Sequence, residues 1–348
     1  MKRTPLTLAN LNSPLTLTLA RNMRATRSPL TAEELGEFAP PRASSVVFGE
    51  EWHLDILDAL DAGYPVRVVG RAGTGKDYFI EQMSAVCGGP LLSLSIKPDL
   101  DINEWVASTT LVVEGGATTS KVVEGPLARA VRGLPYTRNG VEMRHPVTIL
   151  ISDVDRAQPR QVEVLRQALQ SQGEQYLTNP VTGEKIPVCQ GTRFYLTANA
   201  GVDGDGGRGN VSAQLDTSIV NRTMGVLASE PTPEYERKIL QSRFPERSKE
   251  EIALVVKLMR GVKKAVEEGG IPLEISIRSS IQTLDLSARH LSRGASFHDA
   301  LRASMRAFKG HLMEADNRAL IDGAVEAQLG AQTSATQGAP SAQSPIDF

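Results

Sequence analysis

A glycine-rich segment that ends in a lysine is the stretch of this chain best suited to chemistry. Gly70, Gly73 and Gly75 follow the valine-rich run 66–69, which has the pattern of a strand, and helical periodicity begins at Lys76. Glycines let the backbone N–H groups of such a turn point inward without a Cβ clash, and N–H groups at the start of a helix bind anions. The spacing is that of the G-x4-G-K phosphate-binding loop, whose lysine reaches the outer phosphates of a nucleotide.

The loop and the first residues of its helix are therefore predicted to bind a nucleotide. The residues of this predicted site are Gly70, Arg71, Ala72, Gly73, Thr74, Gly75, Lys76, Asp77 and Tyr78. A plain turn between a strand and a helix is the alternative. It is disfavoured because the motif requires this strand and helix context, and the context is present on both sides. Asp77 departs from the motif, which has Ser or Thr at this position.

A second apolar run, 147–151, leads into polar residues. A continuous run of this kind is typical of a strand buried on both faces, and Ser152, Asp153 and Asp155 follow it. Acids at the end of a strand beside a phosphate loop hold Mg²⁺ and polarise the attacking water. The predicted cofactors are a nucleotide and Mg²⁺, and the predicted metal residues are Asp77, Ser152 and Asp153.

The elements that must position these residues fall into two groups. Strand and helix patterns alternate through residues 46–228, which predicts a three-layer α/β core with a mostly parallel sheet, of the P-loop NTPase class. Two segments of this part, 111–123 and 176–188, have the pattern of hairpins. Residues 229–330 show helical periodicity without strands, which predicts a second, all-helical domain.

The composition is that of an ordinary globular protein. Of the 348 residues, 41% are hydrophobic and 22% are charged, and the net charge of −2 excludes a chain that is basic throughout. No apolar run is long enough to cross a membrane. The two cysteines, Cys87 and Cys189, lack metal or disulfide spacing. These features predict a cytoplasmic protein.

The two ends of the chain differ from the rest. Residues 1–45 form a basic arm whose basic residues before the first acid, Glu33, are Lys2, Arg3, Arg21, Arg24 and Arg27. A transit peptide, an arm for nucleic acid and a tail that docks an acidic partner are alternatives to a poorly ordered terminus. Residues 331–348 are rich in Ser, Ala, Gln, Gly and Pro, which predicts a disordered tail.

A series of motifs, in this order along 46–312, resembles those of AAA+ ATPases. The resemblance is to the helix-2-insert group, which holds the MoxR-type ATPases, the CbbQ-like activators, the cobaltochelatase small subunit and the dynein-related modules. The segments that carry it are Phe48–Glu51 before the first helix, Gly70–Asp77 as Walker A, Leu111–Val123 as the inserted hairpin, Asp153–Ala157 as Walker B, Tyr176–Val188 as the hairpin before sensor 1, Thr197–Asn199 as sensor 1, Val220–Arg222 as the finger motif and Ser276–Arg278 as sensor 2.

The resemblance implies ATP hydrolysis. The catalytic residues that it implies are Asp153, Asn199, Arg222 and Arg278. Asn199 would orient the lytic water, Arg222 would reach the nucleotide of an adjacent subunit, and Arg278 would pair with the γ-phosphate from the start of a lid helix. A loop cap is the alternative for Asn199, and an exposed arginine at a helix end is the alternative for Arg222. Arg193 and Arg208 compete with Arg222 for the role of finger.

The same resemblance implies the partners. Proteins of this group work as rings, so the chain is expected to assemble with itself, as a hexamer. It is also expected to remodel an unidentified partner protein, which in this group often has a von Willebrand A-type domain. A nucleic-acid motor or loader that uses the basic arm is an alternative and is not favoured. A nucleotide-gated assembly protein with weak hydrolysis is another, and no membrane partner is expected.

Two alignments of the acidic segment remain open. The family's run reads acid, acid, apolar, Asn or Asp, Arg, Ala. In the first alignment, Asp155 takes the Asn/Asp position of this run. Ser152 then stands at the position of the Walker B aspartate, and Asp153 stands at the position of the catalytic glutamate. Asp77 and Ser152 would then have exchanged a hydroxyl and a carboxylate, and the metal site would keep one of each. Asp153 is also one methylene shorter than Glu, which predicts slow hydrolysis. The other alignment makes Asp153 the metal acid and puts Val154 in the catalytic place, leaving nucleotide binding with little hydrolysis.

Overall fold

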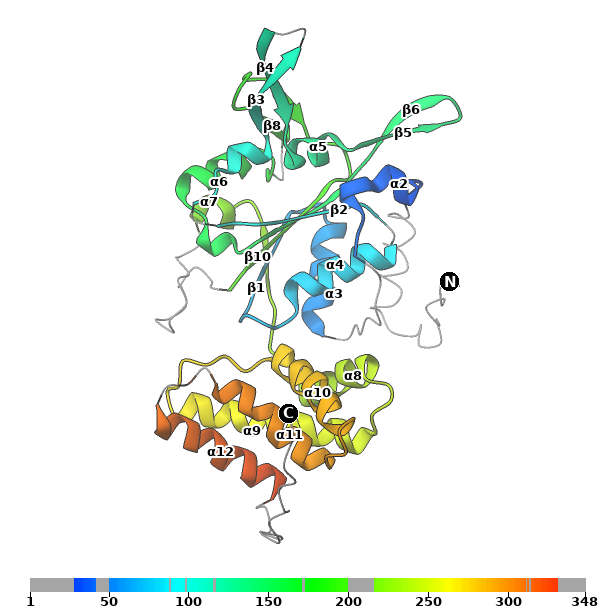
Figure 1. Cartoon of the computed structure of the whole chain (residues 1–348). Helices are drawn as coiled ribbons and strands as arrows, with labels where there is room; N and C mark the ends of the chain where they lie inside the picture. The colour runs from blue at the N-terminus through cyan, green and yellow to red at the C-terminus, as the bar shows by residue number, and fades with distance from the viewer. Residues whose placement is uncertain are drawn as a thin grey trace, which may run out of the picture. The chain divides into compact units, whose positions relative to one another are not determined.

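The chain is seen here as a computed structural model that divides into two compact units, Met1–Pro245 and Glu246–Phe348 (Figure 1). The residues that the structure describes are 28–41, 50–87, 89–97, 99–114, 117–170, 173–199, 216–310, 312 and 314–330. Several predictions lie outside them: most of the basic arm, Phe48 and Gly49 of the entry segment, the finger candidate Arg208 and the tail 331–348.

The first unit is built on a five-stranded sheet in which all neighbouring strands are parallel. Its order is β11-β1-β10-β7-β2. The strands are β1 (Val66–Val69), β2 (Leu91–Ser95), β7 (Thr148–Ser152), β10 (Arg193–Ala198) and β11 (Met224–Leu227). Parallel strands covered on both faces are expected to have near-continuous hydrophobic runs, and the middle residues of β7 (149–151) and β10 (194–196) form such runs. The predicted α/β fold with a mostly parallel sheet is confirmed.

Alternate residues of the strands contribute to two hydrophobic cores, one on each face of the sheet. The helices that cover the faces are α3 (Glu51–Asp61), α4 (Lys76–Cys87), α5 (Pro126–Arg132) and α6 (Pro159–Arg166). Leu150 and Tyr195 pack with α3 and α4, whereas Ile149 and Ile151 pack with α5 and α6. Because successive side chains of a strand point to opposite faces, one apolar run serves both cores and produces the three layers.

Shorter elements complete the first unit. They are α2 (Ala32–Leu35), α7 (Thr217–Val220), α8 (Pro233–Arg243) and three 3₁₀ turns at Gly36–Phe38, Ile102–Trp105 and Val154–Arg156. Leu30, Leu35 and Phe38 are buried in the core beneath α5 and α6, so the end of the predicted arm packs on the body of the protein. The predicted boundary after residue 228 precedes α8, and the first compact unit includes that helix.

Three hairpins accompany the sheet. They are β3–β4 (Ala107–Glu114 and Ala117–Glu124), β5–β6 (Leu134–Arg138 and Val141–His145) and β8–β9 (Tyr176–Thr178 and Lys185–Pro187). The first and third are confirmed predictions. The second was not predicted, although the pair Asn139-Gly140 in its turn is a strong sequence signal for a hairpin. In the structure these two residues have φ of 53° and 77°. Positive φ at both central residues is what the tight hairpin turn requires, and Asn-Gly is its preferred pair.

The second unit is helical, as predicted. Its helices are α9 (Lys249–Glu268), α10 (Ile277–Leu291), α11 (Phe297–Lys309) and α12 (Ala315–Leu329). The side chain of Ser248 accepts a hydrogen bond from the N–H of Glu251, and the carboxylate of Glu251 accepts one from the N–H of Ser248, so a capping box fixes the start of α9. Among the described helices, none combines the length and the apolar character that a membrane crossing needs.

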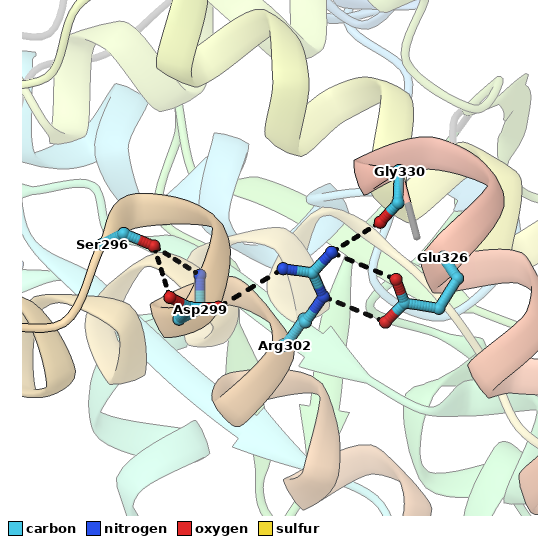
Figure 2. A network of polar contacts seen from close by, with 5 residues as sticks. All are labelled: Ser296, Asp299, Arg302, Glu326 and Gly330. Carbon is cyan, nitrogen blue, oxygen red and sulfur yellow. Dashed lines mark hydrogen bonds and ion pairs between the residues drawn. The ribbon is translucent and has the colours of Figure 1, made fainter. Parts of the chain in front are cut away.

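Arg302 of α11 ties that helix to α12 (Figure 2). Its Nε and Nη2 donate to the two carboxylate oxygens of Glu326 at 2.9 and 3.1 Å, and Nη2 also donates to the carbonyl of Gly330 at 2.6 Å. Nη1 lies 3.4 Å from Asp299, whose N–H is capped by Ser296. The Arg302 side chain is only 15% exposed, so the forked contact is expected to contribute more than a typical surface ion pair.

The change Arg302→Lys is expected to loosen α12, because an ammonium cannot reproduce the two parallel bonds of the guanidinium. We expect a loss of about 1 kcal/mol in the free energy of opening of α12, which is roughly fivefold faster exchange of its amides. Hydrogen–deuterium exchange with mass spectrometry measures this. Lys264→Ala is the control, since its 3.7 Å contact with Glu268 joins two largely exposed side chains. Unchanged exchange in Arg302→Lys would show that the network does not hold α12.

Candidate functional site

The predicted phosphate loop joins the end of β1 to the start of α4, and its backbone requires glycine at three positions. Gly73 and Gly75 have φ of 76° and 91°, a region that residues with a Cβ rarely adopt. A Cβ on Gly70 would lie 2.4 Å from the carbonyl oxygen of Ala228, the residue after β11. The spacing of the three glycines is therefore set by the path of the chain.

Lys76, the first residue of α4, is buried, with 6% of its surface exposed. Its Nζ donates to the carbonyls of Gly70 and Arg71 at 2.7 and 2.9 Å and to Asn199 Oδ1 at 3.1 Å. The guanidinium of Arg71 pairs instead with Glu230 at 2.7 Å, and both of these side chains are more than two-fifths exposed. The ammonium of Lys76 is thus held over the loop at a helix N-terminus, where an anionic group binds favourably.

Asp77, the second residue of α4, lies against the ends of two strands. Its Oδ2 accepts a hydrogen bond from Ser152 Oγ at 2.9 Å, and its Oδ1 accepts one from Thr197 Oγ1 at 2.6 Å. Ser152 ends β7, and Thr197 is the last residue but one of β10. The two residues that were predicted to have exchanged a hydroxyl and a carboxylate therefore touch each other.

Asp153 and Asn199 face each other beyond the ends of β7 and β10. Asn199 Nδ2 donates to Asp153 Oδ1 at 3.2 Å, and Ser95 Oγ, at the end of β2, donates to Asp153 Oδ2 at 3.1 Å. The N–H of Asn199 donates to the buried Asp155 at 3.2 Å. Because Asn199 also accepts from Lys76, its amide links the cation of the loop to an acid of the neighbouring strand.

The backbone of Asp153 is left-handed, with φ of 59° and ψ of 38°. This conformation is unfavourable for residues with a Cβ, although aspartate tolerates it better than most. Such outliers concentrate at functional sites, where the surrounding structure holds them in place. The strained backbone of Asp153 is thus a second reason, besides its hydrogen bonds, to consider it a functional residue.

The burial of Val154 distinguishes the two open alignments. Its side chain is 2% exposed and belongs to the core beneath α5 and α6, so a ligand cannot reach it. Asp153 is only partly buried and contacts Asn199, and Ser152 contacts Asp77. This geometry favours the alignment in which Ser152 has the place of the metal acid and Asp153 that of the catalytic one.

The side-chain donors around Asp77 suit Mg²⁺, because the carboxylate of Asp77 and the hydroxyls of Ser152 and Thr197 are all oxygen ligands. In nucleotide sites Mg²⁺ usually takes one or two carboxylates and completes its shell with water and phosphate oxygens. No group of three His, Cys, Asp or Glu side chains that could hold a metal is found in the part of the chain that the structure describes. Mg²⁺ bound here would therefore depend on phosphate oxygens.

The remaining predicted residues lie elsewhere. Arg222 follows α7, and its Nη1 donates to the carbonyl of Ser218 at 2.9 Å, while its Nε is buried without a hydrogen-bond partner among the described residues. Tyr78 is 44% exposed on the first turn of α4. Arg193 is the first residue of β10, and Arg278 belongs to α10 of the second unit. The roles of these residues stay predictions.

The contacts of two residues of the cluster were not predicted: Ser95 belongs to no predicted motif, and Thr197 was included in the sensor 1 segment without a role of its own. Each is a hydroxyl side chain at the carboxyl end of a parallel strand, the edge at which α/β proteins bind ligands. That position is the signal that could have singled them out. Ser95 contacts Asp153 and Thr197 contacts Asp77. These pairings follow from which strands are neighbours in the sheet, and the sequence does not state that order directly.

Comparison with known proteins finds relatives at low sequence identity. No family model matches it. Protein YojN of Bacillus subtilis (strain 168) is 25% identical over 235 residues, which cover 67% of this chain and 70% of that protein. Protein SAUSA300_1302 of Staphylococcus aureus (strain USA300) is 21% identical over 234 residues, which cover 67% and 81%. Both relatives are described as uncharacterized.

The chain also resembles solved structures at a low level. The RuvB Holliday junction branch migration motor of Thermotoga maritima matches with a TM-score of 0.43 and 13% identity, covering 78% of this chain and 73% of that one. The FIGL-1 AAA domain in complex with ADP matches with a TM-score of 0.44 and 14% identity, covering 86% and 98%. These scores are too low to decide a function, which must therefore come from the geometry of the chain itself.

An aromatic cluster behind the loop fixes the position of α4. The ring of Phe79 stacks on His53 of α3 with centroids 4.1 Å apart, Trp52 meets Phe79 edge-on at 5.3 Å, and Tyr235 of α8 lies 6.0 Å from His53. His53 is 2% exposed, and burial lowers its pKa from 6.5 to about 3. A neutral imidazole is therefore part of the apolar layer that supports the helix carrying Lys76.

Acid is expected to destabilise the first unit through His53. Below pH 6.5 the unfolded chain protonates this imidazole, whereas the folded chain does not until about pH 3. The free energy of unfolding therefore falls as the pH is lowered through this window, by up to about 1.4 kcal/mol per pH unit. His53→Phe keeps a stacked ring that cannot titrate, so it should flatten this part of the profile.

Urea unfolding between about pH 7 and about pH 4 measures the effect of His53. Both tryptophans, Trp52 and Trp105, lie in the first unit, so their fluorescence reports on that unit. The exposed His298 of the second unit supplies the control variant His298→Asn, which should leave the profile unchanged. Equal slopes for wild type and His53→Phe would contradict the prediction.

Proposed function

We propose that this chain is an AAA+-type ATPase that binds ATP at the loop Gly70–Asp77 and hydrolyses it slowly. The observation that carries the proposal is the meeting of Lys76, Asp77 and Asp153 at the carboxyl edge of the sheet, joined through Asn199 and Ser152. Ligands of open α/β sheets bind at this edge. A cation, a carboxylate suited to a metal and a second acid are the groups that phosphoryl transfer uses.

In the proposed reaction the chain's own groups bind, orient and take up a proton. Lys76 would turn from the loop carbonyls to the outer phosphates, and Asp77 would hold Mg²⁺, which supplies charge neutralisation at the β- and γ-oxygens when bound. Asn199 would orient the attacking water. Asp153 would accept the water proton as the water oxygen bonds to the γ-phosphorus and the bond from phosphorus to the β–γ bridging oxygen breaks.

Slow turnover follows from the length of the Asp153 side chain. Asp places its carboxylate about one bond length short of where Glu would place it, and such a displacement can cost on the order of a hundredfold in rate. Slow hydrolysis suits a protein in which the bound nucleotide sets a conformational state, rather than one that translocates rapidly.

We further propose, from the resemblance to the helix-2-insert group, that the protein assembles with itself as a ring, with a hexamer as the expected form. Arg222 would reach the nucleotide of the neighbouring copy, and Arg278 would contact the γ-phosphate. Partner remodelling is supported by the hairpin β3–β4, on which Leu111 and Val113 are each 71% exposed. Exposed apolar side chains of this kind suit contact with a protein, and the resemblance suggests a partner with a von Willebrand A-type domain.

Lys76→Ala is expected to weaken binding of Mg-ATP by about tenfold to a hundredfold, because a buried charge-assisted contact to phosphate is lost. Isothermal titration calorimetry measures the affinity, and phosphate release measures turnover, which should fall as well. Lys121→Ala on the exposed strand β4 is the control and should bind like wild type. A wild-type protein without measurable affinity for ATP would overturn the proposal.

Asp153→Asn is expected to keep ATP binding and to lose hydrolysis. Asn tolerates the left-handed backbone but cannot accept the proton, so the rate of phosphate release should fall on the order of a hundredfold while Kd stays near the wild-type value. Glu163→Gln, at a 60% exposed acid of α6, is the matched control. Weaker Mg-ATP binding at an unchanged rate per bound nucleotide would instead favour Asp153 as the metal acid.

A further inference from the structure

Asp77 puts a negative charge at the place where the loop would receive phosphates. It follows Lys76 directly, and its two oxygens accept hydrogen bonds from Ser152 and Thr197 at 2.9 and 2.6 Å. These contacts fix the carboxylate at the sheet edge without neutralising it, because both donors are uncharged hydroxyls. A Ser or Thr, the usual residue of the motif, would leave this position uncharged.

The cations nearest to Asp77 in the chain are engaged with other groups. Lys76 donates to the carbonyls of Gly70 and Arg71 and to the amide of Asn199, and the Arg71 guanidinium pairs with Glu230 at 2.7 Å.

The charge of Asp77 also acts on a second acid of the same helix. Glu81 lies one turn further along α4, and its pKa is raised first by burial and then by the charge of Asp77. The first two turns of α4 therefore carry two acids on one face, since residues four apart are neighbours on a helix. A triphosphate that approaches this end of α4 meets a local field more negative than the motif normally presents.

We propose that Asp77 makes triphosphate binding at this loop conditional on a divalent cation, an inference that rests on the proposed ATP site. Without the cation, the carboxylate and the phosphate oxygens are like charges at short range in a partly buried place, where water screens them poorly. Asp77 also takes up part of the positive potential of the helix N-terminus. With a cation shared between Asp77 and the phosphates, the same carboxylate becomes an attractive ligand.

Calorimetric titration of ATP into the full chain tests this inference, once with excess Mg²⁺ and once with EDTA. The proteins are wild type, Asp77→Thr and Asp77→Asn. The Thr variant restores the usual residue, and the Asn variant removes the charge at nearly constant size. For each protein we compare the Kd for ATP in EDTA with the Kd in Mg²⁺. We expect this ratio to be about ten times larger for wild type than for either variant. In EDTA the variants should bind ATP more tightly than wild type does.

Glu163→Gln is the matched control, because it removes an exposed acid of another helix, α6, and leaves Asp77 with its two hydroxyl partners. It should keep the metal dependence of wild type, and thermal melting without ligand verifies that each variant is folded. Equal wild-type affinity in Mg²⁺ and EDTA, or no gain in EDTA for folded Asp77 variants, would overturn the inference and leave the proposed ATPase standing. Absence of ATP binding to wild type under both conditions would overturn the two together.

Discussion

The docking of the first turn of α4 against the ends of β7 and β10 is the constraint on which the candidate site depends. Two adjacent residues make it: Lys76 contacts Asn199 at 3.1 Å, and Asp77 contacts Ser152 and Thr197 at 2.9 and 2.6 Å. These contacts join residues between 75 and 123 positions apart, so they exist only when the whole sheet is assembled. A small displacement of α4 would break all three together.

An apolar layer beneath the helix makes that docking possible, and the polar contacts make it specific. Phe79, Ile80 and Met83 of α4 pack with Leu150 and Tyr195 of the strands. Hydrophobic burial is non-directional, so by itself it would tolerate small shifts of α4 along the sheet. The hydrogen bonds at the N-terminal end fix the register. Together they hold a cation and an acid on one rigid element within reach of a shared ligand, as a functional site requires.

The parts of this arrangement that could be predicted are those that local chemistry dictates. The strands were found because burial on both faces demands continuous apolar runs such as 147–151. The loop was predicted from the spacing of its glycines and lysine, and the structure shows that Gly73 and Gly75 adopt the positive φ that favours glycine. The roles of Ser95 and Thr197 escaped prediction because a hydroxyl at a strand end is ordinary until its neighbours are known. Those neighbours follow from the order β11-β1-β10-β7-β2, which is a property of the assembled sheet.

The contact between Asp77 and Ser152 pairs a carboxylate on the first turn of α4 with a hydroxyl at the end of β7. A hydroxyl and a carboxylate form the same hydrogen bond whichever of them stands on the helix. Two carboxylates at these positions would repel each other, and two hydroxyls would leave the pair uncharged. One hydroxyl with one carboxylate is therefore the combination that gives this pair both a hydrogen bond and a single negative charge. The charge of the pair lies on the first turn of α4, beside Lys76, where the helix dipole stabilises it.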